Sequence, residues 1–410
     1  MIRLTSFSFG RGQIMARLPQ SNNNVLLDGS RHRFDRALVF FELPDCDSYQ
    51  RALRTSDVKF VILPKCSLYS HLAATIWAEG VRAMAIEDPA LIGEAAIVYA
   101  DFDSGELLVP ESDADLSVLD AISEGLTARA ECCGSYEQLP TNQLAGIEIR
   151  AEVISSEQLR CMLSSGAIEL GVINAETVFS GDTEIDVHKR ELLSLIQSLS
   201  NRKQIFLRFF DVERISFEST STLAEPKPSL GYRGVRIADF ETIWSVRFCE
   251  LLQFFRRESI VIVLPMVTSA EEILKFQNRF GLESYKMGVT VETPAAALSI
   301  DEILEVVEFV QIGLNDLTQY TMAWDRDIPN EDLLPTDRIA EPVEKLIHAV
   351  ITSCDLQGVP YTIGLDLPPS KTLVSQLLRI GVKSISCALS LVEPWREDLY
   401  SETSRGDWKP

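Results

Sequence analysis

The stretch YKMGVTVETPAAALSIDEILEVVEFVQIGLND, residues 285–316, carries the pattern that decides the fold. An apolar run at Tyr285–Glu292 is followed by a polar turn and a helical pattern, and a second apolar run follows at Glu308–Leu314. Both runs are hydrophobic almost without a break, which is typical of parallel strands buried on both faces. The stretch therefore predicts a strand, a helix and the next strand of a parallel sheet.

The same pattern repeats along residues 146–392. The apolar runs are Gly146–Ile154, Ile168–Glu176, Gln204–Val212, Ser259–Val267, Tyr285–Glu292, Glu308–Leu314, Val359–Leu365 and Ser384–Val392. Eight strand–helix units in about 245 residues match a (β/α)8 barrel, whereas the alternative, a doubly wound open sheet, usually has fewer strands. We therefore expect an α/β protein with a C-terminal (β/α)8 TIM barrel.

Residues 1–112 follow a different pattern, which predicts a smaller, separate α/β domain. One alanine-rich helix is expected at Ser70–Glu79, and short strands are expected at Leu38–Glu42, Val58–Leu63, Arg82–Ile86, Ala96–Tyr99 and Glu106–Val109. Residues 113–140 begin with a helical pattern and end in a loop that closes with Pro140, so we interpret them as a helical linker. The barrel domain is then expected at residues 141–410.

The composition excludes several classes of partner. The chain has 410 residues with 38 Lys and Arg against 60 Asp and Glu, a formal net charge of −22, which repels nucleic acid and anionic membrane surfaces. It lacks an apolar run long enough to span a bilayer and an N-terminal secretory signal, so we expect a cytoplasmic protein. The 8 cysteines include no CxxC pair, which argues against a zinc site or a disulfide framework.

Charged and polar residues gather where the predicted barrel strands end, which is the end that carries chemistry in such barrels. They are Arg208, Arg233, Glu292, Asn315, Asp316 and Arg326. The planar fork of arginine suits a phosphate, and two hard carboxylates suit Mg²⁺. The alternative for each residue alone is a helix cap or an ion pair at the barrel rim.

Several motifs in the same region resemble the phosphoenolpyruvate-utilising family, which includes enzyme I of the sugar phosphotransferase system, phosphoenolpyruvate synthase and pyruvate phosphate dikinase. The motifs are RFFD at 208–211, PSLGYRGVRI at 228–237, VLPMVTSAEE at 263–272, MGVTVETPAAA at 287–297 and VQIGLNDLTQYTMAWDR at 310–326. Their order and spacing are those of the family, so the resemblance covers essentially the whole barrel.

The resemblance implies a role for each residue at the strand ends. Glu292 and Asp316 would be ligands of Mg²⁺ or Mn²⁺. The phosphate and carboxylate of phosphoenolpyruvate would be held by Arg208, Arg233, Asn315 and Arg326, with Arg208 and Arg233 also catalytic. The family further implies a homodimer.

The N-terminal stretch FVILPKCSLYSHLAATIWAEGVRAMAI, residues 60–86, is similar to the swivelling phosphohistidine domain of the family. The similarity implies that His71 is the phosphoryl-accepting histidine. The family's Gly-Gly is replaced here by Lys65-Cys66, which removes close backbone approach to a phosphate. The alternative for His71 is a structural role in the first turn of a helix. Neither the carrier-binding insertion of enzyme I nor an ATP-grasp domain is found, so the usual donor or acceptor for His71 is expected to come from a separate partner protein or not to exist.

The chain departs from the family after the seventh predicted strand. The family has a cysteine there that protonates the enolate of pyruvate, and we align Ile363 with it. Losing such an acid costs about 10²- to 10⁴-fold in rate. Cys387 in the eighth strand is the candidate substitute, and its alternative is a small buried hydrophobic residue.

Two functions follow from these observations. The first is an enzyme that cleaves phosphoenolpyruvate or a similar small phosphorylated acid with Mg²⁺, transfers the phosphoryl group to His71 or to a small substrate, and handles the enolate in an altered way. The second is a non-catalytic regulator that binds phosphoenolpyruvate and Mg²⁺ without turnover.

Overall fold

The structure is a computed structural model, and it describes most of the chain. The described residues are 2–9, 13–17, 35–55, 60–68, 70–92, 97–101, 106–109, 112, 115, 143–144, 146–165, 169–178, 187–201, 203–211, 230–231, 233–239, 242–328, 335 and 337–404. Apart from Asp115, the predicted linker at 113–140 lies outside these residues.

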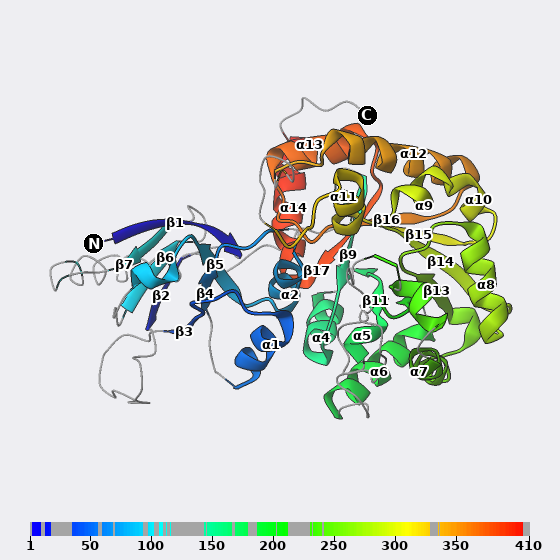
Figure 1. Ribbon diagram of the computed structural model, residues 1–410, viewed down its shortest axis with the longest axis horizontal. Coiled ribbons are helices and arrows are strands. Elements are labelled where there is room, and N and C mark those ends of the chain that lie inside the picture. The colour runs from blue at the N-terminus through cyan, green and yellow to red at the C-terminus, as the bar shows by residue number, and fades with distance from the viewer. Residues whose placement is uncertain are drawn as a thin grey trace. The chain divides into compact units, whose positions relative to one another are not determined.

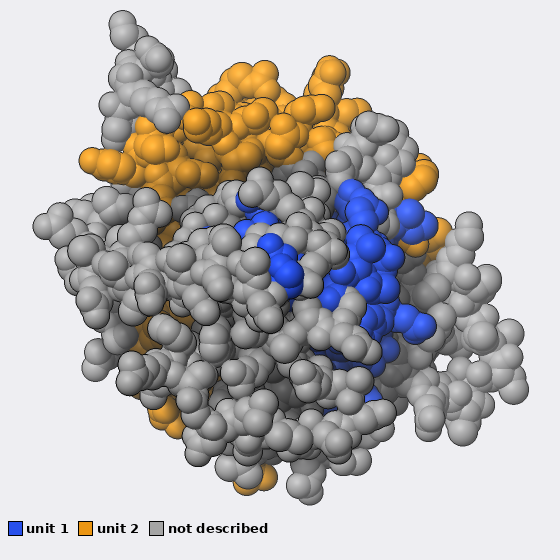
Figure 2. All heavy atoms as spheres, turned by 90° about the vertical axis from the view of Figure 1, so that its left-hand side faces the viewer, with its two compact units in different colours: residues 1–139, 327–329 blue, residues 140–326, 330–410 orange. Residues whose placement is uncertain are grey.

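The chain divides into two compact units, coloured blue and orange in Figure 2. Unit 1 comprises Met1–Leu139 together with Asp327–Pro329, and unit 2 comprises Pro140–Arg326 together with Asn330–Pro410. Each unit has a sheet of its own, so each is described by itself.

Unit 1 is built on a small closed barrel of strands in the order β1-β5-β4-β3-β2-β6-β7 (Figure 1). The bounds are β1 Ile2–Phe9, β2 Gln13–Arg17, β3 Asp35–Val39, β4 Phe60–Pro64, β5 Arg82–Ile86, β6 Ile97–Asp101 and β7 Glu106–Val109, with helices α1 Cys46–Thr55 and α2 His71–Glu79 and the 3-10 turn η1 Pro89–Ile92. Its core includes Phe60, Ile62, Met84, Val98 and Leu107, which are almost fully buried. Burial of these side chains drives closure of the sheet.

Helix α2 begins and ends as its sequence dictates. The Ser70 hydroxyl accepts a hydrogen bond from the Ala73 N–H at 3.1 Å, and this serine is the N-cap. Gly80 ends the helix with φ 70°, a left-handed conformation that glycine adopts without strain. His71 is therefore the first residue of the helix.

Unit 2 is built on a curled parallel sheet of the TIM-barrel type, as the sequence predicts. The order is β10-β9-β17-β16-β15-β14-β13-β12-β11, and β8 pairs antiparallel with β9. The bounds are β8 Gln143–Leu144, β9 Ile147–Glu152, β10 Glu169–Leu170, β11 Ile173–Asn174, β12 Ile205–Arg208, β13 Ile260–Leu264, β14 Lys286–Val291, β15 Phe309–Gly313, β16 Tyr361–Gly364 and β17 Ser384–Ala388. Since β10 and β11 at the two ends of this order are separated by only Gly171 and Val172, the sheet returns to itself there.

Helices connect the strands of unit 2 and lie on the outside of the sheet (Figure 1). They are α4 Ser156–Ser165, α5 Ala175–Val178, α6 Val187–Ser200, α7 Thr242–Leu252, α8 Ala270–Phe280, α9 Pro294–Leu298, α10 Ile300–Leu304, α11 Leu314–Met322, α12 Glu341–Gln357, α13 Lys371–Arg379 and α14 Leu389–Ser404, with 3-10 turns η3 Gly234–Asp239 and η4 Arg257–Ser259. Apart from β8, the strands of this sheet run in the same direction, so their carboxyl ends meet at one rim.

The inner face of the barrel changes character along the strands. Val261, Val263 and Phe309 pack in one apolar cluster, and the Phe309 ring lies 4.0 Å from the ring of Phe206. Residues two positions along a strand share a face, so Gln311, next to Phe309 in this alternation, also points inward. Along β12 and β15 the inner face therefore changes from aromatic to polar toward the carboxyl ends of the strands.

The turn after β14 shows how sequence fixes a side chain at this rim. Thr293 caps α9, because its hydroxyl accepts from the Ala296 N–H at 3.1 Å and donates to the Val267 carbonyl at 3.0 Å. Pro294 begins the helix, where its missing N–H costs nothing. Glu292 is thereby held between the last strand residue and a rigid cap.

Within the described part of the chain, no helix is both long enough and apolar enough to span a membrane.

Candidate active site

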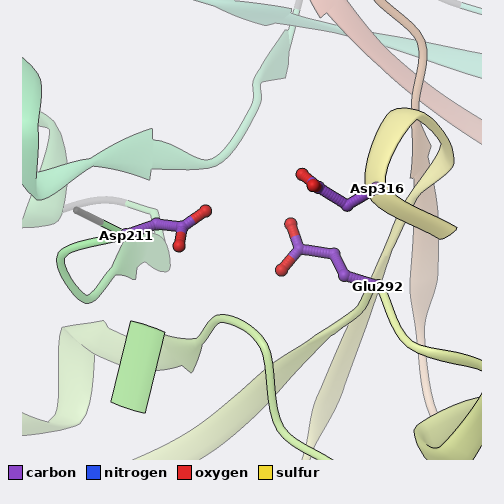
Figure 3. Close-up of side chains that lie close together, drawn as sticks. All are labelled: Asp211, Glu292 and Asp316. Carbon is purple, nitrogen blue, oxygen red and sulfur yellow. The ribbon is translucent and has the colours of Figure 1, made fainter. Parts of the chain in front are cut away.

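Three carboxylates meet at the rim of unit 2. Oxygens of Asp211, Glu292 and Asp316 lie within 4.8 Å of one another, and Figure 3 shows the three side chains pointing toward a common space. Glu292 directly follows β14, Asp316 lies in the first turn of α11, and Asp211 follows β12. We call these residues the carboxylate trio. It brings together the two predicted metal ligands and adds Asp211.

Arginines surround the carboxylate trio. Arg233, which is 2% exposed, donates to both oxygens of Asp211 at 2.9 and 3.0 Å and to Asp316 Oδ1 at 2.9 Å. Arg326 donates to Asp316 Oδ2 at 3.0 Å. Arg208 Nη1 lies 3.7 Å from Glu292 Oε1, and its Nη2 lies 3.8 Å from Glu176 Oε1. All three predicted arginines are thus in one cluster with the acids.

Some polar atoms in this cluster have no hydrogen-bond partner among the described residues. They are Arg208 Nε, Arg326 Nε, Asn315 Oδ1 and Glu176 Oε2, and all four are buried. An unsatisfied buried polar group costs about 1–3 kcal/mol. The two arginine Nε–H groups are donors, so they are natural contact points for a ligand that offers anionic acceptor oxygens.

Glu292 lies in an environment that disfavours its charge. Burial is the main cause, and Asp211 and Asp316 add to it, so the pKa of Glu292 rises to about 8. The Met266 N–H donates to Glu292 Oε2 at 3.0 Å, which holds the side chain in place. A divalent cation would offset the repulsion within the carboxylate trio, whose hard oxygens are the ligands that Mg²⁺ and Mn²⁺ prefer. The trio therefore fits such an ion.

Gly313 at the end of β15 leaves room for Glu292. A Cβ atom at Gly313 would lie 2.5 Å from Glu292 Cγ and 2.9 Å from Glu292 Oε1. Ordinary carbon contacts are about 3.5–4.0 Å, so any larger residue would displace the carboxylate.

His71 lies in unit 1, at the start of α2. Its Nδ1 is 3.1 Å from Oδ2 of Asp327, which belongs to the same compact unit, and the Asp327 carboxylate also accepts from the His71 backbone N–H at 3.0 Å. The imidazole is 40% exposed. Asp327 as an acceptor favours the tautomer with the proton on Nδ1, which leaves the Nε2 lone pair free.

Ile363 and Cys387 are both fully buried, in β16 and β17. Their strand neighbours face inward, because the Ser384 hydroxyl donates to the Thr362 hydroxyl at 3.1 Å inside the sheet. Alternation then directs Ile363 and Cys387 to the outer face of the sheet, and Gly364 to the inner face. The pKa of Cys387 is raised well above its ordinary value. Burial is the main cause, and nearby carboxylates of unit 2 add to it.

Two further acids at this rim were not singled out from the sequence. Asp366, two residues after β16, accepts from Asn315 Nδ2 at 3.4 Å. Glu152 ends β9 and accepts from Ser386 Oγ at 2.8 Å. A signal existed for Glu152 and also for Asp211, since each ends or closely follows an apolar run, as Glu292 does.

Comparison with known proteins identifies the family to which this chain is similar. Residues 133–403 match the family model described as "PEP-utilising enzyme, PEP-binding domain". A probable phosphoenolpyruvate synthase of Methanocaldococcus jannaschii is 29% identical over 286 residues, which is 62% of this chain and 24% of that protein. A phosphoenolpyruvate-protein phosphotransferase of Buchnera aphidicola subsp. Schizaphis graminum is 25% identical over 79% of this chain and 61% of that protein. The chain therefore spans less than two thirds of the length of these relatives.

Proposed function

The chain belongs to the phosphoenolpyruvate-utilising enzyme family, and from this premise we propose that it cleaves phosphoenolpyruvate with Mg²⁺ or Mn²⁺ and transfers the phosphoryl group to His71 or to a small substrate. In this reaction the bond between the enol oxygen and phosphorus breaks, and a bond between the acceptor and phosphorus forms.

One observation carries the proposal. Arg208 Nε, Arg326 Nε and Asn315 Oδ1 are buried without hydrogen-bond partners among the described residues, beside the carboxylate trio. Phosphoenolpyruvate offers anionic oxygens on both its phosphate and its carboxylate, which the two arginine Nε–H groups would bind. Arginine suits both groups because its planar guanidinium donates several hydrogen bonds at once.

The carboxylate trio would hold the metal ion, with Glu292 and Asp316 as the predicted ligands and Asp211 as a third acid within reach. When bound, the ion supplies positive charge for the phosphate and enolate oxygens. Arg208, between Glu176 and Glu292, would orient the phosphate and stabilise charge that develops on it.

His71 is the favoured acceptor, because its Nε2 lone pair is left free by the contact of Nδ1 with Asp327. Transfer to Nε2 forms the N–P bond while the enol oxygen keeps the electrons of the broken O–P bond. A small nucleophile is the other acceptor that fits the same chemistry.

A non-catalytic regulator is the second candidate function. It is favoured by the resemblance, which aligns Ile363 with the family's acid, and by the full burial of Cys387. A site that binds phosphoenolpyruvate but cannot protonate its enolate would act as a sensor. The resemblance also supports a homodimer, which light scattering of the pure protein tests. It further supports a separate partner protein.

The deciding experiment incubates the pure protein with Mg²⁺ and phosphoenolpyruvate and follows phosphorus and protons by ³¹P and ¹H NMR. Pyruvate together with acid-labile phosphate on the protein is expected for the enzyme. Calorimetric binding that needs Mg²⁺ and gives no product would favour the regulator. Unchanged binding in Glu292→Gln, or no binding in the wild type, would refute the site.

A further inference from the structure

Glu152 stands at the polar end of the barrel interior, outside the carboxylate trio. Ser386 Oγ donates to its Oε1 at 2.8 Å, and Gln311 Nε2 donates to the same oxygen at 3.2 Å. Among the described residues, no hydrogen bond ends on Oε2. The carboxyl group is thus fixed through one oxygen while the other is available to a ligand.

The environment of Glu152 favours its protonated form. Burial is the main cause and the nearby Asp366 is the second, so the pKa of Glu152 rises to about 7. Ser386, Arg208 and Gln311 act in the opposite direction, and the thiol of Cys387 is the other titratable group nearby. An acid with a pKa near neutrality holds a proton and can also release it, which is the condition for general acid catalysis.

Gly364 leaves space beside this carboxyl group. A Cβ atom at Gly364 would lie 3.5 Å from Gln311 Nε2, the same nitrogen that donates to Glu152. Gln311 Nε2 is thus near both the Glu152 carboxyl group and the inward-facing position at the end of β16. A Cβ atom at Gly364 would make only ordinary van der Waals contacts, so this position can accommodate a small group without displacing its neighbours.

Arg208 connects this space to the carboxylate trio. Its guanidinium lies 3.7 Å from Glu292, and the negative charge of Glu152 acts on the same guanidinium. If Arg208 bound the phosphate of a three-carbon enol acid, the methylene carbon of that ligand would lie beside the guanidinium. Glu152 and Gly364 lie at this rim. Glu292, Glu176 and Asp366 are other acids here whose pKa values are raised, and Glu292 is assigned to the metal ion.

We propose that Glu152 is the acid that protonates the methylene carbon of the enolate, in the space beside Gly364. The inference rests on the proposed function and deepens it. After the O–P bond breaks and the phosphoryl group bonds to the acceptor, the enolate C=C electrons form the new C–H bond. The Glu152 O–H bond breaks, the enolate becomes pyruvate, and Glu152 remains as a carboxylate that regains its proton from water.

The test uses proton exchange rather than phosphoryl transfer. Pyruvate is incubated with the full-length protein and Mg²⁺ in D₂O, and loss of the methyl proton signal is followed by ¹H NMR. Proton exchange at the methyl carbon of pyruvate needs Glu152 and the metal site. It does not need His71 or a phosphoryl donor. The wild type is expected to catalyse exchange with an apparent pKa near that of Glu152, which is about 7.

Glu152→Gln keeps the shape of the side chain and removes the acid, so exchange is expected to fall by about 100-fold or more. Its calorimetric affinity for phosphoenolpyruvate with Mg²⁺ should stay within a few-fold of wild type, which also reports folding. Glu148→Gln is the matched control, since Glu148 lies on the same strand and pairs with Arg150 at 3.0 Å. It is expected to leave exchange unchanged.

Gly364→Cys in the Glu152→Gln protein adds a thiol in the open position and is expected to restore part of the exchange. Wild-type exchange that persists in Glu152→Gln would overturn the role of Glu152 and leave the proposed function standing. Binding of phosphoenolpyruvate without any exchange in the wild type would overturn it as well. Absence of both binding and exchange would instead remove the proposed function, and this inference with it.

Discussion

Replacing Gly313 by alanine tests whether the position of Glu292 controls the site. The new Cβ would lie 2.5 Å from Glu292 Cγ, and an ordinary carbon contact needs about 3.5 Å, so the two groups must separate by about 1 Å. Overpacking of this kind costs about 1–3 kcal/mol of unfolding free energy. A carboxylate displaced by this distance leaves the narrow range that metal coordination allows, so Mn²⁺ affinity is expected to fall by about 10- to 100-fold.

Gly364→Ala is the matched control for this change. Gly364 lies opposite Gly313 in the register of β15 and β16, and a Cβ there meets nothing closer than 3.5 Å. Urea unfolding and Mn²⁺ titration followed by calorimetry are measured for both variants. Gly364→Ala should behave as wild type in both assays. If Gly313→Ala also does so, then Glu292 either adapts freely or does not bind the metal, and the reasoning about this rim fails.

Three other predictions use different measurements. Arg233→Met removes the arginine that bridges Asp211 and Asp316 and leaves Asp316 with Arg326 alone, so urea unfolding should show a loss of about 3–5 kcal/mol, and a loss below about 1 kcal/mol would contradict the bridging role. His71→Gln should abolish acid-labile phosphate after incubation with ³²P-labelled phosphoenolpyruvate, whereas His348→Gln should retain it; equal labelling of both would exclude His71 as the acceptor. Because the folded pKa of Glu152 is about 7 and lies above the ordinary value of 4.5, the folded state binds more protons between these values, and Glu152 lowers stability as pH rises through that window. Glu152→Gln should therefore raise the free energy of unfolding relative to wild type more at pH 8 than at pH 5, and an equal difference at both values would argue against the raised pKa.

The sequence predicts the barrel well because buried parallel strands leave a clear signal in continuous apolar runs. Within the predicted run Ile168–Glu176, β10 covers Glu169–Leu170 and β11 covers Ile173–Asn174, and the break at Gly171 and Val172 was not predicted. A Cβ at Gly171 would lie 2.6 Å from Ser386 Oγ, a contact between residues far apart in the chain. Only the folded sheet reveals why glycine is needed there.

The site is predicted in part for a similar reason. Glu292 and Asp316 each stand where an apolar run ends, and strand ends meet at one rim, so their proximity follows from the fold class. The sequence does not predict which residue of β16 faces inward, because a strand that is apolar on both faces shows no alternation of apolar and polar residues. The sequence alignment places Ile363 at the position of the family's acid. In the structure, the register of the sheet directs Gly364 toward the interior instead.

The bridge from Arg233 to Asp211 and Asp316 has a consequence for how the site fills and empties. The guanidinium acts as a built-in counter-ion, and its single positive charge offsets part of the negative charge of the two aspartates before any metal arrives. An incoming ion competes with a tethered charge that is always present at the same effective concentration. The competition raises the Mg²⁺ concentration needed for half occupancy, and loss of the ion should leave the rim folded and ready to rebind.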